Sequence, residues 1–459
     1  MVTGLIPCNL LKTKTTLLVL IASIVLVCPN VFAVESSGNL RIGGVSGKSD
    51  FPGDLQGETN DVQAISTRLQ LDVDGLTRKD DYLQFDLRDR YDFFGRAESE
   101  VLALTAENIL QIREAAYRRP WERNRHHFTV GRFRLDEAGI LANDGASYGY
   151  RLSRYGRIGF FLGIAPEDIV KPPSVEPDVR GFDGNQGGVY YSYDKKNSDG
   201  KGSIYMNHAI SQAPSFELNE FINRVFYFHQ GVFLLGSSHR FSSFVNFDLA
   251  PAASLRRGYL SYGYYSGRSR LRMSLTRITA EDYRVQQNVL DDLEPSTRSS
   301  LSTDYQYRLT SSLDVRGGII YDRRSVDGLG ANDIYAGARY NGLLSKQLAL
   351  GVRYGIRDDF LSDDSYLRLT ANYFHRNFSI NLQYSSESRV FDDGSTLNPT
   401  IIYSELGFYL SDKIRGSLAY STTSAEDRNI TTAFFMMAYR FGSDSVAPVR
   451  RRTPSFEEF

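Results

Sequence analysis

Cysteine is almost absent from this sequence: its 459 residues include only Cys8 and Cys28. Both lie in residues 1–33, where Lys12 and Lys14 precede a short apolar run that ends in small residues, the pattern of a cleaved export signal. A chain cleaved after residue 33 has no thiol. This excludes a disulfide framework, a cysteine metal site and a cysteine nucleophile, although export takes the chain to where disulfides form.

Long apolar runs are missing as well. The run inside the signal is shorter than the about 20 residues that a membrane-spanning helix needs, so we favour cleavage over an uncleaved anchor. A lipid anchor on Cys28 is disfavoured because Val27 stands where a small residue is expected. No later stretch is apolar enough to span as a helix. Proline is sparse at 14 residues, and no linker-like tract precedes residues 442–459, so the sequence shows no seam between domains.

No charge of one sign dominates the sequence. Without Lys12 and Lys14, 51 of the 53 basic residues remain against 54 acidic ones, a net charge of −3. This balance implies neither nucleic acid nor an anionic surface as a partner. Among the basic residues, arginine outnumbers lysine by 43 to 10 in the whole chain. Arginine carries a planar fork of donors that matches carboxylate and phosphate groups.

The dominant pattern that is present has a period of two residues. In "RSRLRMSLTRI", the apolar side chains of Leu271, Met273 and Leu275 alternate with those of Arg270 and Arg272. Alternation of this kind predicts a strand with one apolar and one polar face. Similar segments recur along the chain, and helical periodicity is nearly absent. The sequence therefore predicts an all-β fold.

The spacing of the connections distinguishes a membrane barrel from a soluble sheet. Short turns are expected at 310–312, 343–346, 376–377 and 411–412, and longer loops at 281–297, 324–332, 358–364, 391–398 and 424–429. This alternation of short turns and long loops is typical of bacterial outer-membrane barrels. The strands between the connections run about ten to thirteen residues, close to the 9–11 of a tilted membrane strand.

We therefore predict a closed antiparallel transmembrane β-barrel over residues 34–441. The count is about 22 strands, within a range of 16–22 because residues 218–236 form either one long strand or two. Closure is required because hydrocarbon offers the backbone no hydrogen-bond partner. The alternative is a soluble sandwich, propeller or solenoid, but the sequence lacks the 20–50-residue repeats that propellers and solenoids show.

The last predicted strand carries an alternating row of Phe435, Met437, Tyr439 and Phe441. This row resembles the terminal signal of Gram-negative outer-membrane β-barrel proteins. The resemblance implies insertion by the barrel-assembly machinery, contact with outer-membrane lipid, and a location in the cell outer membrane. Residues 442–459 then form a periplasmic extension, either disordered or a tether to a periplasmic partner.

Two further features of the sequence bear on the barrel. Phe434 and Met436 make the opposite face of the last strand apolar too, so a segment inside the barrel is expected to cover them. Residues 113–151 carry "REA", "VGR" and "DG" on successive predicted strands, a pattern that resembles a segment of large Gram-negative porins. This resemblance implies a porin-like architecture and names no solute.

Charged residues are predicted on the inner, lumen-facing side of the barrel. The candidate pore-lining residues are Arg88, Arg90, Arg270, Arg272, Arg308, Arg316, Arg339, Arg353, Arg368, Asp86 and Asp304. They either order anionic solutes or pair with neighbouring acids to hold strand register. Asp168, Glu176 and Asp178, in the long connection 165–187, are candidates for a constriction loop, and 281–297 is a second candidate loop. A mobile outer loop is the alternative for each.

The sequence indicates no enzyme. Its six histidines show no metal-ligand spacing with carboxylates, and no order of serine, histidine and acid stands out, so neither a metal nor a cofactor is predicted. Two functions stay open. One is a porin-like channel for passive diffusion of small hydrophilic, in particular anionic, solutes. The other is a non-enzymatic scaffold or conduit for a partner or exported polymer, which 22 strands favour because barrels this wide are usually filled.

Overall fold

The structure is a computed structural model that describes most of the chain between Ser36 and Gly442. The described residues are 36–50, 62–74, 81–92, 108–120, 124–139, 141–166, 184–196, 202–217, 220–251, 253–279, 297–325, 327–342, 345–360, 362–425 and 428–442. The predicted signal at 1–33 and the tail beyond Gly442 lie outside these ranges.

Almost every described segment is a β-strand, as the alternation predicts. The strands are β1 (Ser36–Asp50), β2 (Val62–Asp74), β3 (Tyr82–Asp92), β4 (Asn108–Arg119), β5 (His126–Leu135), β6 (Leu141–Arg151), β7 (Gly156–Ile164), β8 (Asn185–Lys196), β9 (Gly202–Glu217), β10 (Glu220–Leu235), β11 (His239–Ala250), β12 (Ser254–Tyr265), β13 (Ser269–Thr279), β14 (Thr297–Arg308), β15 (Leu313–Arg324), β16 (Gly330–Asn341), β17 (Leu348–Asp359), β18 (Ser362–Phe374), β19 (Phe378–Phe391), β20 (Thr396–Leu397), β21 (Thr400–Tyr409), β22 (Ile414–Ala425) and β23 (Arg428–Phe441). One short 3₁₀ turn, η1 (Asp136–Ala138), lies between β5 and β6.

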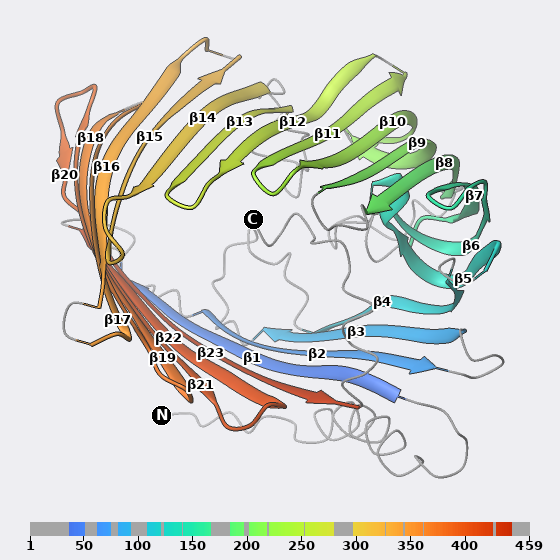
Figure 1. Ribbon diagram of the computed structural model, residues 1–459, viewed down its shortest axis with the longest axis horizontal. Helices are drawn as coiled ribbons and strands as arrows, with labels where there is room; N and C mark the ends of the chain where they lie inside the picture. Colours follow the sequence, from blue (N-terminus) through green and yellow to red (C-terminus); the bar gives the residue numbers. More distant parts are fainter. Residues whose placement is uncertain are drawn as a thin grey trace.

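The strands form one closed antiparallel sheet (Figure 1). Each long strand pairs with its neighbours in sequence, and β1 closes the ring by pairing with β23, with Gly38 opposite Phe441. β20 has only two residues and pairs with the end of β19, so the described part of the wall contains 22 long strands. The predicted count of 22 is confirmed, and the doubtful segment 218–236 contains a single strand, β10.

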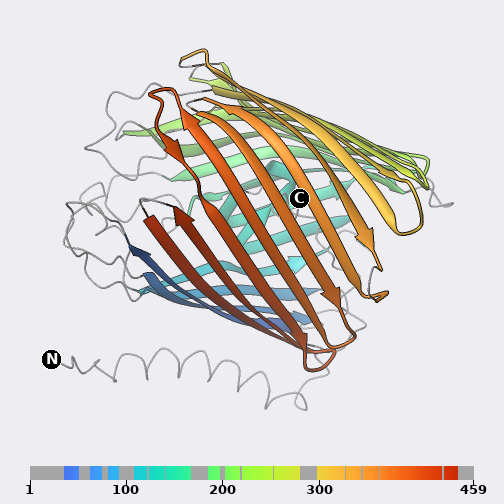
Figure 2. The same ribbon diagram turned by 90° about the vertical axis from the view of Figure 1, so that its left-hand side faces the viewer.

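The two faces of the sheet differ in polarity. Ile158, Phe160 and Leu162 on β7, and Leu275 on β13, are between 45% and 63% exposed, and similar apolar side chains follow around the ring. The strands are steeply tilted (Figure 2). In a closed, tilted barrel the backbone N–H and C=O groups of the strands pair with each other and need no water. With its apolar outer face, the protein is therefore a transmembrane β-barrel.

The ends of the barrel carry connections of unequal length. We call the end where β1 begins and β23 ends the turn end, and the opposite end the loop end. Turn-end connections such as 375–377 and 410–413 are short, as predicted. At the loop end, however, the prediction of loops at 358–364 and 424–429 is wrong, because both connections are shorter. Strand pairing continues almost to the tip, so that β17 and β18 are joined by residues 360–361 and β22 and β23 by 426–427.

The last strand lies against glycines of the first. Phe435, Met437 and Tyr439 are on the outer face of β23 and are 36–45% exposed. On β1, a Cβ at Gly38 would lie 2.5 Å from Cζ of Phe441, and the aromatic side chain therefore covers a position where only glycine fits. The aromatic side chains of β23 thus pack over glycines of β1 where these two strands pair and close the barrel.

Candidate functional site

The inner face of β13–β19 carries most of the predicted pore-lining residues. The register aligns them strand by strand on one face: Arg272 lies opposite Asp304, Arg339 opposite Asp314, and Arg353 opposite Arg368. Arg270 and Arg272 alternate with Met273 and Leu275, which are exposed on the outer face. We call this surface, from β13 to β19, the arginine wall.

Ion pairs neutralise the part of the arginine wall nearest the loop end. Arg389 Nη2 lies 2.7 Å from Glu387 Oε2, and its Nε lies 3.8 Å from Asp364 Oδ2. Arg357 lies 3.8 Å from Asp364 and 4.0 Å from Asp333. Three carboxylates therefore surround two guanidinium groups, so these arginines hold neighbouring strands together and offer little free positive charge.

A second cluster joins β14, β15 and β16. The Arg316 guanidinium pairs with Asp304, and the Tyr335 hydroxyl donates to the same Asp304 Oδ2 at 2.5 Å. Cζ of Arg353 lies 4.5 Å from the centre of the Tyr335 ring, within the range of a cation–π contact. Arg308 on β14 makes a similar pair, with its Nε 3.4 Å from Oδ1 of Asp314 on β15. Some of the predicted arginines therefore act in strand pairing.

Other predicted arginines have no carboxylate partner among the residues that the structure describes. Within the described ranges, no carboxylate oxygen lies within 4.0 Å of the guanidinium nitrogens of Arg270, Arg272, Arg339, Arg353 or Arg368. The two interpretations left open by the sequence, strand pairing and free positive charge, thus apply to different members of the same set.

The N-terminal candidates lie on β3. Asp86 is 2% exposed and accepts two hydrogen bonds from Arg68, at 2.8 and 2.6 Å. Arg88 lies opposite Arg68 in the register. Arg90 is on the same strand, but its side chain lies outside the described part of the structure. Asp86 is therefore a strand-pairing residue that holds β2 against β3.

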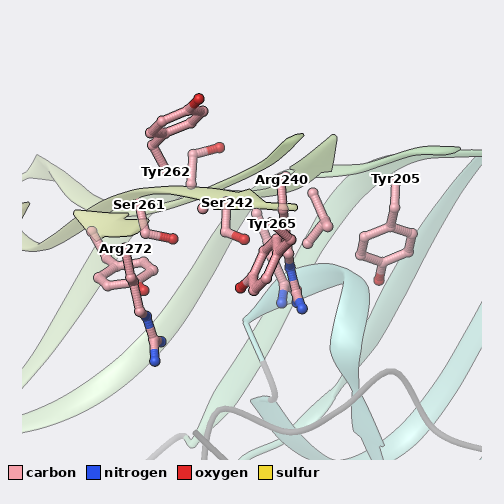
Figure 3. A pocket seen from close by; sticks show the side chains of 13 residues that line it. Tyr205, Arg240, Ser242, Ser261, Tyr262, Tyr265 and Arg272 are labelled. Atoms are coloured by element: carbon pink, nitrogen blue, oxygen red, sulfur yellow. The ribbon is translucent and has the colours of Figure 1, made fainter. Parts of the chain in front are cut away.

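A hollow opens on the inner face between β9 and β13, at one edge of the arginine wall. Side chains of Tyr205, Arg240, Ser242 and Arg272 line it and point to the same side of the sheet, whereas Tyr262 points to the other (Figure 3). The lining combines two arginines with hydroxyl groups. It is suited to polar, hydrated solutes and lacks the convergent acid and base groups of a catalytic centre.

The opposite part of the ring, β5–β10, is packed on its inner side. The turn 136–139 folds inward against β8 and β9, and Ala138 is 0% exposed there. Buried aromatic side chains surround it, namely Phe133, Phe161, Tyr190 and Phe228. Gly139 ends the turn with φ +83°, and a Cβ there would lie 3.0 Å from Phe228. We call this surface, with its inward turn, the packed wall.

A buried ion pair fastens the inward turn to the packed wall. The Arg157 guanidinium on β7 pairs with the Glu137 carboxylate of the turn. Burial is the largest single influence and by itself would raise the pKa of Glu137. Arg157, a backbone hydrogen bond, His127 and Arg118 together outweigh burial and hold this pKa below its usual value. Beside the pair, His127 Nε2 lies 2.7 Å from the Tyr190 hydroxyl. The turn is thus held by charge as well as by apolar contact.

The inward turn was not predicted from the sequence. The predicted constriction residues Asp168, Glu176 and Asp178 lie outside the described residues, as does most of 281–297. The signal available for the turn was "LDEAG" after β5, where acidic residues and a glycine follow an inward leucine.

The described residues offer neither a metal site nor a membrane-spanning helix. No group of three or more His, Cys, Asp or Glu side chains there is arranged to hold a metal ion. None of the helical segments in those ranges has the length and apolar character to cross a membrane.

Comparison with known proteins finds similarity only in solved structures. No family model matches the sequence, and no curated protein matches it. A BenF-like porin from Pseudomonas fluorescens Pf-5 is similar over 89% of this chain and 99% of its own, with 11% identity and a TM-score of 0.45. OpdK of Pseudomonas aeruginosa has the same coverages and identity and a TM-score of 0.44. OccAB4 of Acinetobacter baumannii is similar over 89% of this chain and 98% of its own, with 11% identity and a TM-score of 0.42. Similarity this weak adds nothing to the barrel that the strand register itself establishes.

Proposed function

We propose that the protein is a porin-like channel of the Gram-negative outer membrane, through which small hydrophilic solutes diffuse passively with a preference for anions. The observation that carries this proposal is the polarity of the closed sheet. Its outer face is apolar, and its arginine wall bears at least five arginines that no described carboxylate neutralises. A surface with an excess of one charge sign inside a low-dielectric shell raises the local concentration of the opposite ion.

A scaffold or conduit function is the second candidate, and the width of the ring favours it. With strands 4.7–4.9 Å apart and tilted 35–45°, a circular barrel of 22 strands measures about 40–48 Å between opposite backbones. The inward turn narrows only one side. In addition, Phe434 on the inner face of β23 is 43% exposed, an apolar surface that a partner inside the barrel could cover.

Reconstitution of the purified protein in a planar bilayer separates the two functions. An open channel gives steady ohmic conductance, and in a salt gradient its reversal potential has the sign of anion preference. Replacing both Arg270 and Arg272 by Ala should reduce that preference. Arg277→Ala is the control, because Arg277 is on the same strand but alternates with these residues and lies on the outer face. A folded barrel without conductance would reject the channel and favour the conduit.

We also propose that residues 1–33 are removed on export and that the barrel-assembly machinery reads the row of Phe435, Met437, Tyr439 and Phe441. The turn end then faces the periplasm, where 442–459 is available to a partner. Deleting 439–441 should abolish insertion, whereas truncation after Gly442 should leave it intact. Heat-modifiable migration in gels measures the folded fraction of each variant. Equal folding of both variants would contradict the assembly role.

A further inference from the structure

Two arginines of the arginine wall face each other without a carboxylate between them. Arg353 on β17 lies directly opposite Arg368 on β18, and Arg368 lies opposite Ser385 on β19. On the other side of Arg353 is Gly337, which has no side chain to pair with it. Like charges in this position are unfavourable unless an anion lies near them.

The same wall offers a comparison two inward-facing levels closer to the loop end. There, beyond the level of Tyr335 and Tyr366, Arg357 and Arg389 share Asp333, Asp364 and Glu387. At the Arg353 level, no carboxylate in the described ranges lies within 4.0 Å of either guanidinium. The described residues therefore supply counter-charges to one pair of arginines and place none within 4.0 Å of the pair two levels away.

Unsatisfied polar atoms mark the same place. Ser385 is 0% exposed, and its Oγ has no hydrogen-bond partner in the structure. Nε of Arg368, the residue opposite it, is buried and likewise without a partner. Buried polar atoms are almost always hydrogen-bonded, so the Ser385 hydroxyl and Nε of Arg368, on paired residues, are two donors that a ligand at this place can use. Because the adjacent side chains are cationic, an anion satisfies both the charge and the hydrogen bonds.

Arg353 is held ready for such an anion. Its Cζ lies 4.5 Å from the centre of the Tyr335 ring, and Tyr335 is 8% exposed and held by its hydrogen bond to Asp304. Among the described residues, none accepts a hydrogen bond from the Arg353 guanidinium, so its N–H groups are available to donate. A planar fork of this kind binds the paired oxygens of a carboxylate or phosphate.

We propose that Arg353, Arg368 and Ser385 form a binding site for one oxyanion group, a carboxylate or phosphate, on the inner wall of the barrel. The two guanidinium groups donate to the oxyanion from β17 and β18. The Ser385 hydroxyl donates from β19 once the half-buried Arg368 head moves towards the ligand. The site refines the proposed anion channel and rests on it for its biological role, but its existence is a property of the folded barrel alone.

Calorimetric titration of the barrel in detergent micelles, with inorganic phosphate and then acetate, tests the site without requiring conduction. We expect saturable binding of one anion per chain. The double variant Arg353→Gln, Arg368→Gln should weaken it at least tenfold, as expected for lost hydrogen bonds between charged groups. Ser385→Ala, which changes no charge, should weaken it by a smaller factor of about three to ten.

The double variant Arg270→Gln, Arg272→Gln is the matched control, because it removes the same charge from the same wall four strands away. It should change the phosphate affinity less than threefold. Equal weakening by both double variants would show a diffuse field and overturn the site. So would the absence of saturable binding to a barrel whose folding is verified by heat-modifiable migration. An unchanged phosphate affinity in Ser385→Ala would show that this hydroxyl does not contact the anion and would overturn its place in the site. Binding to a barrel that does not conduct would reject the channel function and leave the site intact.

Discussion

The packed wall and the arginine wall are built on the same alternating backbone, yet their inner faces differ in kind. On the packed wall, Phe161 is 0% and Tyr190 2% exposed, because the turn 136–139 folds over them. On the arginine wall, Arg272 and Arg316 are exposed to the lumen. Alternation decides which side chains face inward. Whether that face becomes a core or a pore lining depends on whether another segment covers it.

The largest expected effect comes from truncating the packed wall. Phe161→Ala removes a fully buried ring and should lower the free energy of unfolding by about 3–5 kcal/mol, because the surrounding wall cannot close the cavity. Ile320→Ala is the comparison on the arginine wall. This side chain on β15 is half-buried, no inward segment of the described residues covers it, and its loss should cost about 1–2 kcal/mol. Urea titration of the folded fraction in lipid vesicles measures both. Equal costs would mean that the two walls are packed alike.

The next effect concerns the ion pair that holds the inward turn. Arg157→Gln leaves Glu137 buried without its partner and should lower the free energy of unfolding by about 2–3 kcal/mol, less than a fully buried pair because water reaches the turn. It should also release the turn and raise the single-channel conductance. Adding Glu137→Gln to this variant removes the carboxylate left without a partner. The double variant should therefore regain part of the lost free energy of unfolding. If Arg157→Gln alone leaves both quantities unchanged, the packed wall does not depend on the pair.

The same pair gives a pH dependence of known sign. Because the folded-state pKa of Glu137 is below its usual value of 4.5, the pair stabilises the turn fully above that value. The stabilisation is lost as the pH falls through the lower folded-state pKa. Conductance should therefore rise at acid pH in the wild type and remain flat in Glu137→Gln over the same range. A rise near neutral pH would point to another titrating group.

The contrast between the walls also explains how much the sequence could predict. Strand number, the inner and outer faces, and the outward row ending in Phe441 follow from alternation, which is local. The inward turn does not, because Gly139 finds its partner Phe228 about ninety positions later in the chain. The same limit applies to charge. Arg316 and Arg353 have the same strand pattern. Only the structure shows that the Arg316 side chain reaches diagonally to Asp304, whereas Arg353 lies opposite Arg368 in the register.

The smallest expected effect on stability is on the arginine wall itself. Arg316→Gln breaks a pair in which the arginine side chain is 46% exposed, so the free energy of unfolding should change by no more than about 1 kcal/mol. Its effect on ion selectivity should also be small. The Arg316 guanidinium is engaged with Asp304 and so offers few donors to a passing anion, and Asp304 keeps the hydrogen bond from Tyr335 after the change. Arg272→Gln, which removes an unpaired arginine, should shift the reversal potential more than Arg316→Gln does, at equal change in net charge. Equal shifts would mean that total lumen charge, rather than pairing, sets selectivity, and the division of the arginine wall into paired and unpaired residues would have no functional meaning.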